Sequence, residues 1–364
     1  MTATTPVDRT GRLVFSAWSA VSPYGIGGDA FAAGVVAGRD ATTELDQETY
    51  PGPYPRAGLV PEFTAAGALG RKGTRTMDRV TAIAVSAVGQ LIETCGPELL
   101  AEPDRVGLVL GTGSGSVQSI MDFTKDSLTG VKPYHVDPAL FPNTVMNRAA
   151  GQSAIWHGIK GPNTTIAGGA LTGLLALSYA VRLYRGGHCD RALLGAAEEY
   201  SVQRAWLEWH GRTGSDGPAA PLGEGGAVFL LEPSADAETA GRAPLATVLA
   251  TGFRAFGDPA DARRAVADCV RAAVAKAGVR AADVRLVAPA GGEFEAAEDG
   301  GVTDALDGAA PEFVRCGRLV GDTSAAGASF QLAAVLAKGG GGIALVTGVD
   351  RDGTVGCAVL ELAG

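Results

Sequence analysis

Hydrophobic positions along the chain follow two alternating patterns. Short runs of consecutive apolar residues, typical of buried strands, are separated by longer segments in which apolar residues recur every three to four positions, as on one face of a helix. Segment 77–92 carries the second pattern, with Val80, Ile83 and Leu91 on one face. The runs that predict strands are 13–17, 106–110, 164–167, 190–196, 227–231, 284–287, 343–347 and 355–362. This alternation predicts an α/β fold built of layered sheets and helices.

The second half of the chain repeats the rhythm of the first. The apolar runs 227–231 and 357–360 are similar in sequence, and each closes one half. A polar stretch, residues 234–242, lies between the halves. The pattern therefore predicts two units, residues 1–240 and 241–364.

Composition and charge narrow the classes of partner. The 364 residues include 53 glycines and only 6% aromatic residues, which suits close packing of helices on sheets. The net charge is −9 and no basic stripe is present, so nucleic acid is not expected as a partner. The sequence contains no run of about 18 apolar residues, so no membrane span is expected. Residues 1–12 lack an apolar signal region, so a cytoplasmic protein is expected.

Other patterns that often mark cofactor sites are weak. No pair of the five cysteines has C-x-x-C spacing, and the four histidines lack the spacing of metal ligands. The glycine run 111–115 has its third glycine one position early for a dinucleotide loop, so it predicts a close backbone approach instead. The acidic run from Glu293 to Asp299 is expected to be an exposed loop.

The most informative segment is 161–173, which contains Ala170. It predicts a short β-branched strand, a tight run of small residues and the start of a helix. A side chain at such a corner lies at a helix N-terminus, where about half a positive charge stabilises a thiolate or an alkoxide. The position suits a nucleophile, yet it carries a methyl group.

This segment resembles the nucleophile segment of β-ketoacyl synthases, the condensing enzymes of fatty-acid and polyketide assembly. In that family the catalytic cysteine lies nine residues after the first glycine, which corresponds here to Ala170. The resemblance continues through residues 21–25, 75–79, 141–158 and 221–225. It implies the thiolase fold, in which two similar halves stack as α-β-α-β-α layers.

The resemblance also indicates which parts of the family's catalytic unit are missing. A condensing enzyme uses a cysteine thiolate, two histidines and a supporting lysine to take the acyl chain, promote decarboxylation and stabilise the enolate and oxyanion. The matching positions here hold Ala170, Ala290, Asp322 and Gly317. Residues 348–353 replace the family's Gly-Phe-Gly-Gly loop. Because members of such a unit act together, no condensing activity is expected from this chain alone.

A retained scaffold without its chemistry suggests a non-catalytic subunit. The chain resembles the chain length factor of a type II polyketide synthase, which forms a heterodimer with a catalytic ketosynthase and sets the depth of a tunnel for the growing chain. Aromatic systems usually carry glutamine at the position of Ala170, so a polyene-type system is equally open. The resemblance implies an acyl carrier protein as a further partner. No cofactor is expected on the chain itself, and a phosphopantetheine-linked acyl chain would reach it through the partner subunit.

Three alternatives stay open at this point. A residual malonyl-carrier decarboxylase or acyltransferase would use Asp322 as a desolvated base and the Ala170 N–H as an oxyanion donor. An engineered inactive ketosynthase would explain Ala170, but not the changes at Ala290, Asp322 and residues 348–353. The last alternative is a scaffold or regulator with no role in polyketide assembly.

The chain length factor hypothesis assigns candidate residues to a tunnel and to an interface. The helix-like stretch 116–123 provides the tunnel candidates Val117, Gln118, Ile120, Met121 and Phe123. The dimer-interface candidates are Phe141, Asn143, Met146, Thr164, Thr165 and Ile166. Ordinary core packing is the alternative for both groups. The basic residues Arg71, Lys72, Arg75 and Arg79 would either meet an acidic carrier protein or form a solvated face.

Overall fold

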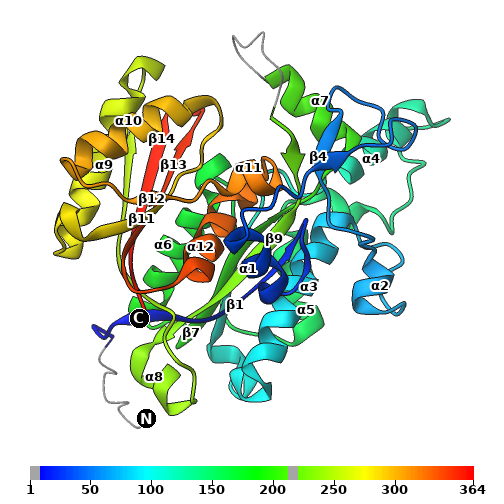
Figure 1. Cartoon of the computed structure of the whole chain (residues 1–364). Helices are drawn as coiled ribbons and strands as arrows, with labels where there is room; N and C mark the ends of the chain where they lie inside the picture. The colour runs from blue at the N-terminus through cyan, green and yellow to red at the C-terminus, as the bar shows by residue number, and fades with distance from the viewer. Residues whose placement is uncertain (1–8, 212–219) are drawn as a thin grey trace.

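A continuous 11-stranded sheet organises the computed structural model, which describes residues 9–211 and 220–364 (Figure 1). Ten of its strands form two five-stranded halves, which we call the first and the second sheet, and the remaining strand, β2, pairs with β1. The strand order is β6-β5-β7-β9-β1 in the first sheet and β12-β11-β13-β14-β10 in the second. The sheets join where β1 pairs antiparallel with β10, at Val14–Thr247 and Phe15–Ala246. The strands are β1 (Leu13–Ser22), β5 (Val106–Gly111), β6 (Asn163–Ile166), β7 (Arg191–Glu198), β9 (Gly225–Pro233), β10 (Ala246–Ala255), β11 (Val284–Ala288), β12 (Glu312–Phe313), β13 (Gly342–Asp350) and β14 (Thr354–Leu362).

The two sheets share one topology. Counted in chain order within each half, the strands lie in the order 3-2-4-5-1 in both sheets. The second strand, β5 or β11, pairs parallel with both of its neighbours, whereas the fifth, β9 or β14, pairs antiparallel with both of its own. This repeat confirms the two similar halves, and the chain passes from one half to the other between β9 and β10.

Helices cover the outer faces of both sheets and fill the space between them (Figure 1). α3 and α5 pack outside the first sheet, α9 and α10 pack outside the second, and α6 and α12 contact each other in the middle. The core between the sheets includes Leu174, Phe229, Phe330 and Leu360. These helices are α3 (Arg79–Cys95), α5 (Arg148–His157), α6 (Thr172–Arg185), α9 (Ala262–Ala277), α10 (Glu295–Leu306) and α12 (Gly327–Lys338). The layers therefore follow the order α-β-α-β-α.

Shorter elements complete the described parts of the chain. The helices among them are α1 (Gly28–Val36), α2 (Ala65–Leu69), α4 (Val117–Thr129), α7 (Val202–Gly211), α8 (Ser234–Thr239) and α11 (Cys316–Val320). The strands are β2 (Gly25–Ile26), β3 (Thr43–Glu44), β4 (Arg56–Gly58) and β8 (Leu222–Gly223). Short 3₁₀ turns include η3 (Phe141–Thr144), η4 (Gly169–Leu171), η7 (Gly292–Phe294) and η8 (Ser324–Ala326).

The hydrophobic pattern located the main elements because the sheets are buried on both faces. Each predicted apolar run falls within or overlaps a strand, although β1 and β13 extend further than expected, to Ser22 and Asp350. The glycine run that starts at the last residue of β5 allows the predicted close approach, since a Cβ on Gly111 would overlap the side chain of Thr172 in α6. His157 is half-buried, with Nε2 hydrogen-bonded at 2.9 Å to the carbonyl of Val85.

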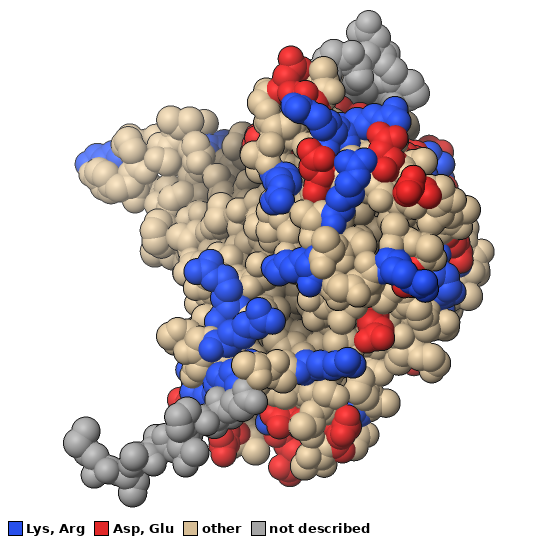
Figure 2. Space-filling view, turned by 90° about the vertical axis from the view of Figure 1, so that its left-hand side faces the viewer, with Lys and Arg blue, Asp and Glu red and all other residues tan. Residues whose placement is uncertain are grey.

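Within residues 9–211 and 220–364, the structure contains neither a membrane-spanning helix nor a cluster of metal ligands. No helix there is long and apolar enough to span a membrane, and no group of three or more His, Cys, Asp or Glu residues is placed to hold a metal ion. In the upper part of Figure 2, acidic and basic side chains intermingle over the face that bears α9 and α10. Exposed ion pairs such as Arg263–Asp304 and Arg264–Asp261 occur there and add little to stability.

Candidate functional site

Ala170 lies where a strand, a tight turn and a helix meet, as the sequence predicts. β6 ends at Ile166, η4 follows and α6 begins at Thr172. The Thr172 hydroxyl accepts the Gly168 N–H at 3.0 Å and donates to the Gly169 carbonyl at 2.8 Å, which fixes the turn. Gly169 has a φ of +51°, in the left-handed region that favours glycine. We call this turn, residues 168–171, the Ala170 seat.

The backbone N–H of Ala170 is bonded to a carboxylate from the other half of the chain. It donates to Oδ2 of Asp350 at 2.7 Å. Asp350 is the last residue of β13, and it is only 6% exposed. Its Oδ1 accepts the N–H of Asp352 at 2.9 Å, so both oxygens are held. The residual-enzyme alternative needs the Ala170 N–H as an oxyanion donor, and the structure does not meet this requirement because the Asp350 carboxylate accepts that N–H.

Two of the four degenerate catalytic positions lie next to Gly348, and a third, Gly317, lies next to Ala290. A Cβ on Gly348 would lie 3.9 Å from the Ala290 Cβ and 4.0 Å from the Ala170 carbonyl oxygen. A Cβ on Gly317 would lie 3.6 Å from the Ala290 carbonyl oxygen. The fold thus brings Ala170, Ala290 and Gly317 together, but these residues supply no thiol, imidazole or amine.

Asp322 is a turn-capping residue exposed to solvent. Its Oδ1 accepts the Ser324 N–H at 2.8 Å, at the start of η8. Its backbone carbonyl accepts the Gly223 N–H at 2.7 Å and the Arg204 Nη2 at 3.1 Å. The residual-enzyme alternative needs a desolvated Asp322, and the exposed position of this side chain does not meet that requirement.

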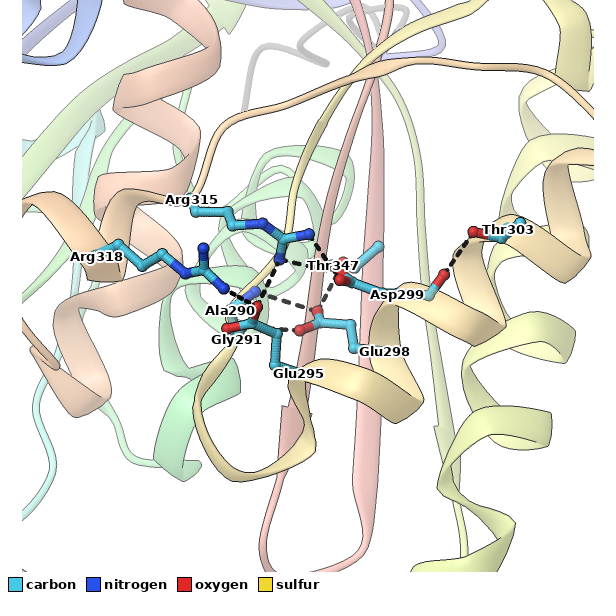
Figure 3. Close-up of polar contacts among 9 residues, drawn as sticks. All are labelled: Ala290, Gly291, Glu295, Glu298, Asp299, Thr303, Arg315, Arg318 and Thr347. Carbon is cyan, nitrogen blue, oxygen red and sulfur yellow. Dashed lines mark hydrogen bonds and ion pairs between the residues drawn. The ribbon is translucent and has the colours of Figure 1, made fainter. Parts of the chain in front are cut away.

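The acidic run 293–299 is not the exposed loop that its charge predicts. It forms η7 and the start of α10, and Glu298 within it is completely buried. The Glu298 carboxyl group accepts the N–H groups of Ala290 at 3.1 Å and Gly291 at 2.9 Å, and the Thr347 hydroxyl at 2.7 Å (Figure 3). Burial raises the pKa of Glu298. The charge pattern does not predict the burial of Glu298, because two of its hydrogen-bond partners are backbone N–H groups just after β11.

The arginines next to Gly317 bind acids of α10 instead of entering the seat. Arg315 contacts Asp299 at 2.6 Å and Glu295 at 3.4 Å, and Arg318 also pairs with Glu295. Figure 3 shows both guanidinium groups directed toward these α10 carboxylates. No arginine of this cluster therefore replaces the family's lysine beside Ala290.

Two adjacent buried carboxyl groups at the end of β7, Glu198 and Glu199, carry no clear signal in the sequence. Glu198 accepts the Gly113 N–H at 3.1 Å. Glu199 accepts the Ser116 hydroxyl at 3.1 Å and the Gln118 N–H at 3.2 Å, where α4 begins. Burial raises the pKa of Glu198, and it raises the pKa of Glu199 to about 8. Together they fix the glycine turn and the first residues of α4.

Comparison with known proteins identifies the family. A family model for the N-terminal domain of β-ketoacyl synthase matches residues 12–237. This chain belongs to the β-ketoacyl synthase family. It is 42% identical to a chain of the ishigamide ketosynthase/chain length factor, with 97% of this chain and 100% of that chain covered and a TM-score of 0.86.

More distant β-ketoacyl synthases are similar at lower identity. The 3-oxoacyl-acyl-carrier-protein synthase 2 of Vibrio harveyi is 29% identical over 223 residues, which are 56% of this chain and 52% of that enzyme. The match therefore spans about half the length of that relative. A solved β-ketoacyl synthase from Burkholderia phymatum has a TM-score of 0.85 at 18% identity over 98% of this chain and 100% of that chain. The layered halves and these matches show the thiolase fold.

The tunnel candidates of this chain lie on α4, most of whose side chains are exposed or half-buried. Val117 is buried, Gln118, Ile120 and Phe123 are half-buried, and Met121 is exposed. The rings of Phe123 and Phe141 lie 5.9 Å apart between centroids. A tunnel role for these five residues stays a prediction.

The interface candidates occupy two kinds of surface. Thr164, Thr165 and Ile166 belong to β6, which is the outermost strand of the first sheet. Phe141 is 56% exposed and Met146 is 44% exposed. Other exposed apolar side chains on α4 and in the segment that follows it are Met121, Leu128, Val131, Tyr134 and Val145. An open strand edge and a group of exposed apolar side chains are each typical of an interaction surface.

Asn143 differs from the other interface candidates because it is buried. It is 4% exposed, and its Nδ2 donates to the Thr76 carbonyl at 2.7 Å. Its side chain thus ties η3 to the segment before α3 and offers little surface to a second chain.

The four basic residues near α3 divide into two groups. Arg71, Lys72 and Arg75 are exposed, as a carrier-protein contact or a solvated face requires. Arg79 instead donates its Nε to Oε2 of Glu224 at 2.6 Å, and the Glu224 side chain is fully buried. This pair joins two segments, 75–79 and 221–225, that carry the family resemblance.

Proposed function

We propose that this chain is the chain length factor of a type II polyketide synthase, a non-condensing subunit that pairs with a catalytic ketosynthase. The observation that carries the proposal is the Ala170 seat, which has no nucleophile and whose N–H is taken by Asp350. The 42% identity to a chain of the ishigamide ketosynthase/chain length factor supports the same assignment.

The chemistry of condensation requires groups that the seat lacks. Acyl transfer needs a nucleophile, decarboxylation needs a group that stabilises the enolate, and both need a free oxyanion donor. Ala170, Ala290 and Gly317 supply none of these, and Asp322 lies in solvent. A partner subunit with an intact thiol would have to perform the reaction.

The proposed partner surface consists of β6 and the exposed apolar side chains of residues 117–146. The edge of β6 can continue the first sheet into a second chain by strand pairing. α4 would then lie against the partner, where its side chains set the depth of a tunnel for the growing polyketide. An acyl carrier protein would deliver its phosphopantetheine-linked chain to the partner's thiol, and this subunit would hold no cofactor.

We propose a polyene-type rather than an aromatic system, because Ala170 lies where chain length factors of aromatic systems usually carry glutamine. Co-expression with a cysteine-bearing ketosynthase, preferably one encoded beside this chain, tests the pairing. A stable one-to-one complex that elongates carrier-bound chains is expected. If the two chains purify separately under conditions in which both are folded, the proposal is wrong.

A further inference from the structure

Asp350 links the two halves of the molecule at the Ala170 seat. Its carboxylate belongs to β13 of the second half, whereas the N–H that it accepts belongs to η4 of the first half. The two residues are 180 positions apart in the sequence, so their contact depends on the packing of β13 against η4. Because Asp350 is buried, water competes little for the Ala170 N–H.

The turn that follows β13 holds the carboxylate in place. The Gly353 N–H donates to the Asp350 carbonyl at 3.0 Å and closes the turn. The Asp352 N–H donates to the second carboxylate oxygen at 2.9 Å. Arg351 forms an ion pair with Glu208 of α7 at 3.4 Å, which anchors the turn from outside. The side chain is therefore set in one orientation before any ligand arrives.

The corresponding turn in the second half shows what is unusual. η8 precedes α12 as η4 precedes α6, and Ser324 has a φ of +45°, close to the +51° of Gly169. In that turn the N–H of Ser324, the counterpart of Gly169, donates to Asp322, only two residues away. A local cap of this kind is common at helix starts. The Ala170 seat instead receives its carboxylate from the other half of the chain.

We propose that Asp350 is an internal anion that seals the Ala170 seat, because its carboxylate occupies the place that the carbonyl oxygen of an acyl thioester would need. The inference rests on the proposed function, since it concerns a seat that does not condense. A carboxylate accepts a backbone N–H more strongly than a neutral thioester carbonyl does, so the thioester does not displace it. The same negative charge would also raise the pKa of a thiol placed at position 170. The seat is thus blocked independently of the missing cysteine.

The test places a thiol in the seat of the full-length chain and measures its reactivity. The variant Ala170→Cys is alkylated with iodoacetamide at neutral pH, and the modified peptide is quantified by mass spectrometry, which separates it from the five native cysteines. In this reaction the thiolate displaces iodide, and the thiol proton goes to the buffer. The companions are Ala170→Cys with Asp350→Asn, which keeps the shape, and Ala170→Cys with Asp350→Gly, which opens the seat. Asp352→Asn is the control, because Asp352 is an exposed acid of the same turn.

Removal of the Asp350 charge is expected to speed alkylation of the introduced thiol by about tenfold or more, which corresponds to one unit in the thiol pKa. The Asp352→Asn control is expected to leave the rate near that of Ala170→Cys alone. Equal rates with and without Asp350 would overturn the proposal.

A second measurement leaves residue 170 unchanged. Hydrogen exchange of the Ala170 amide is expected to accelerate in Asp350→Gly, because the amide loses the acceptor that protects it. Unchanged exchange in a folded Asp350→Gly chain would also overturn the inference. Neither the alkylation rate nor the exchange rate depends on a partner. If Ala170→Cys is alkylated rapidly although Asp350 is present, and the chain still pairs with a ketosynthase, only the Asp350 proposal is refuted. Condensation by the unmodified chain alone would refute the proposed function itself.

Discussion

Gly169 and Asp350 fit together only because residue 169 has no side chain. A Cβ on Gly169 would overlap the Oδ2 atom of Asp350, the atom that accepts the Ala170 N–H. The backbone of Gly169 is also left-handed, with a φ of +51°. Two independent features therefore require glycine at position 169: its left-handed backbone conformation and the buried Asp350 carboxylate beside it.

The variant Gly169→Ala is expected to lose roughly 2 to 4 kcal/mol of unfolding free energy, from the left-handed backbone and the overlap together. Urea denaturation of Gly169→Ala in the wild-type and Asp350→Gly backgrounds separates the two causes. The loss should be smaller when Asp350 is absent, because only the backbone cost remains. An identical loss of unfolding free energy in both backgrounds would show that the Asp350 carboxylate makes no steric contact with a side chain at position 169.

Arg79→Ala is expected to destabilise the chain by about 3 to 5 kcal/mol, because it leaves the fully buried Glu224 carboxylate without its guanidinium partner. Denaturant unfolding provides the measurement. Arg75→Ala is the matched control, since Arg75 is exposed four residues earlier, and a change of no more than about 0.5 kcal/mol is expected there. Equal effects of the two substitutions would contradict a structural role for the Arg79–Glu224 pair.

Glu199 makes the stability of the fold depend on pH. Burial raises its pKa from 4.5 to about 8, and the nearby Asp78 and Glu198 carboxyl groups add to the shift. The folded chain therefore binds a proton at Glu199 between pH 4.5 and about 8 that the unfolded chain has lost. Stability should fall as the pH rises through this range.

The variant Glu199→Gln should reduce that fall, because its amide stays neutral at every pH. Unfolding free energies measured across the same range test this expectation. Glu98→Gln changes an exposed side chain and should follow the parent curve. Parallel curves for the parent and Glu199→Gln would contradict ionisation of a buried Glu199.

Thr165 offers a selective way to block the edge of β6. The carbonyls of Pro162 and Ile166 accept N–H groups from β5 and the residue after it, at 2.8 and 3.0 Å. Backbone groups of successive residues point to opposite sides of a strand, so Thr165 directs its N–H to the open edge of β6. Thr165→Pro removes that donor and should abolish co-purification with a ketosynthase while the chain stays folded. Thr165→Val keeps the N–H and should retain the complex. Co-purification of Thr165→Pro at the parental level would exclude strand pairing at β6.

The local sequence was sufficient to predict the strand, turn and helix of the Ala170 seat, but not the Asp350 carboxylate that occupies it. Residues 161–173 predict the strand, turn and helix because consecutive residues determine all three. Asp350 lies 180 positions away, and its approach depends on how β13 packs against η4. The sequence placed residues 348–353 in the family's loop position, but it contains no information on where the Asp350 carboxylate points.

Charge patterns were misleading where backbone groups are the partners. Glu298 belongs to an acidic run, yet it is buried on the N–H groups of Ala290 and Gly291. Glu199 similarly binds the start of α4. Such contacts require the three-dimensional meeting of a strand end with a helix start, which no spacing of acids along the chain reveals.

Condensation by the separated subunits tests the central claim most directly. Carrier-bound malonyl and a carrier-bound starter are given to this chain alone, to its complex with a ketosynthase, and to the complex whose partner cysteine is replaced by alanine. The account predicts chain extension only in the intact complex, and no release of carbon dioxide by this chain alone. The complex without the partner's cysteine should not extend chains, because acyl transfer needs that nucleophile. Condensation by this chain alone, or by the complex without the partner's cysteine, would contradict it.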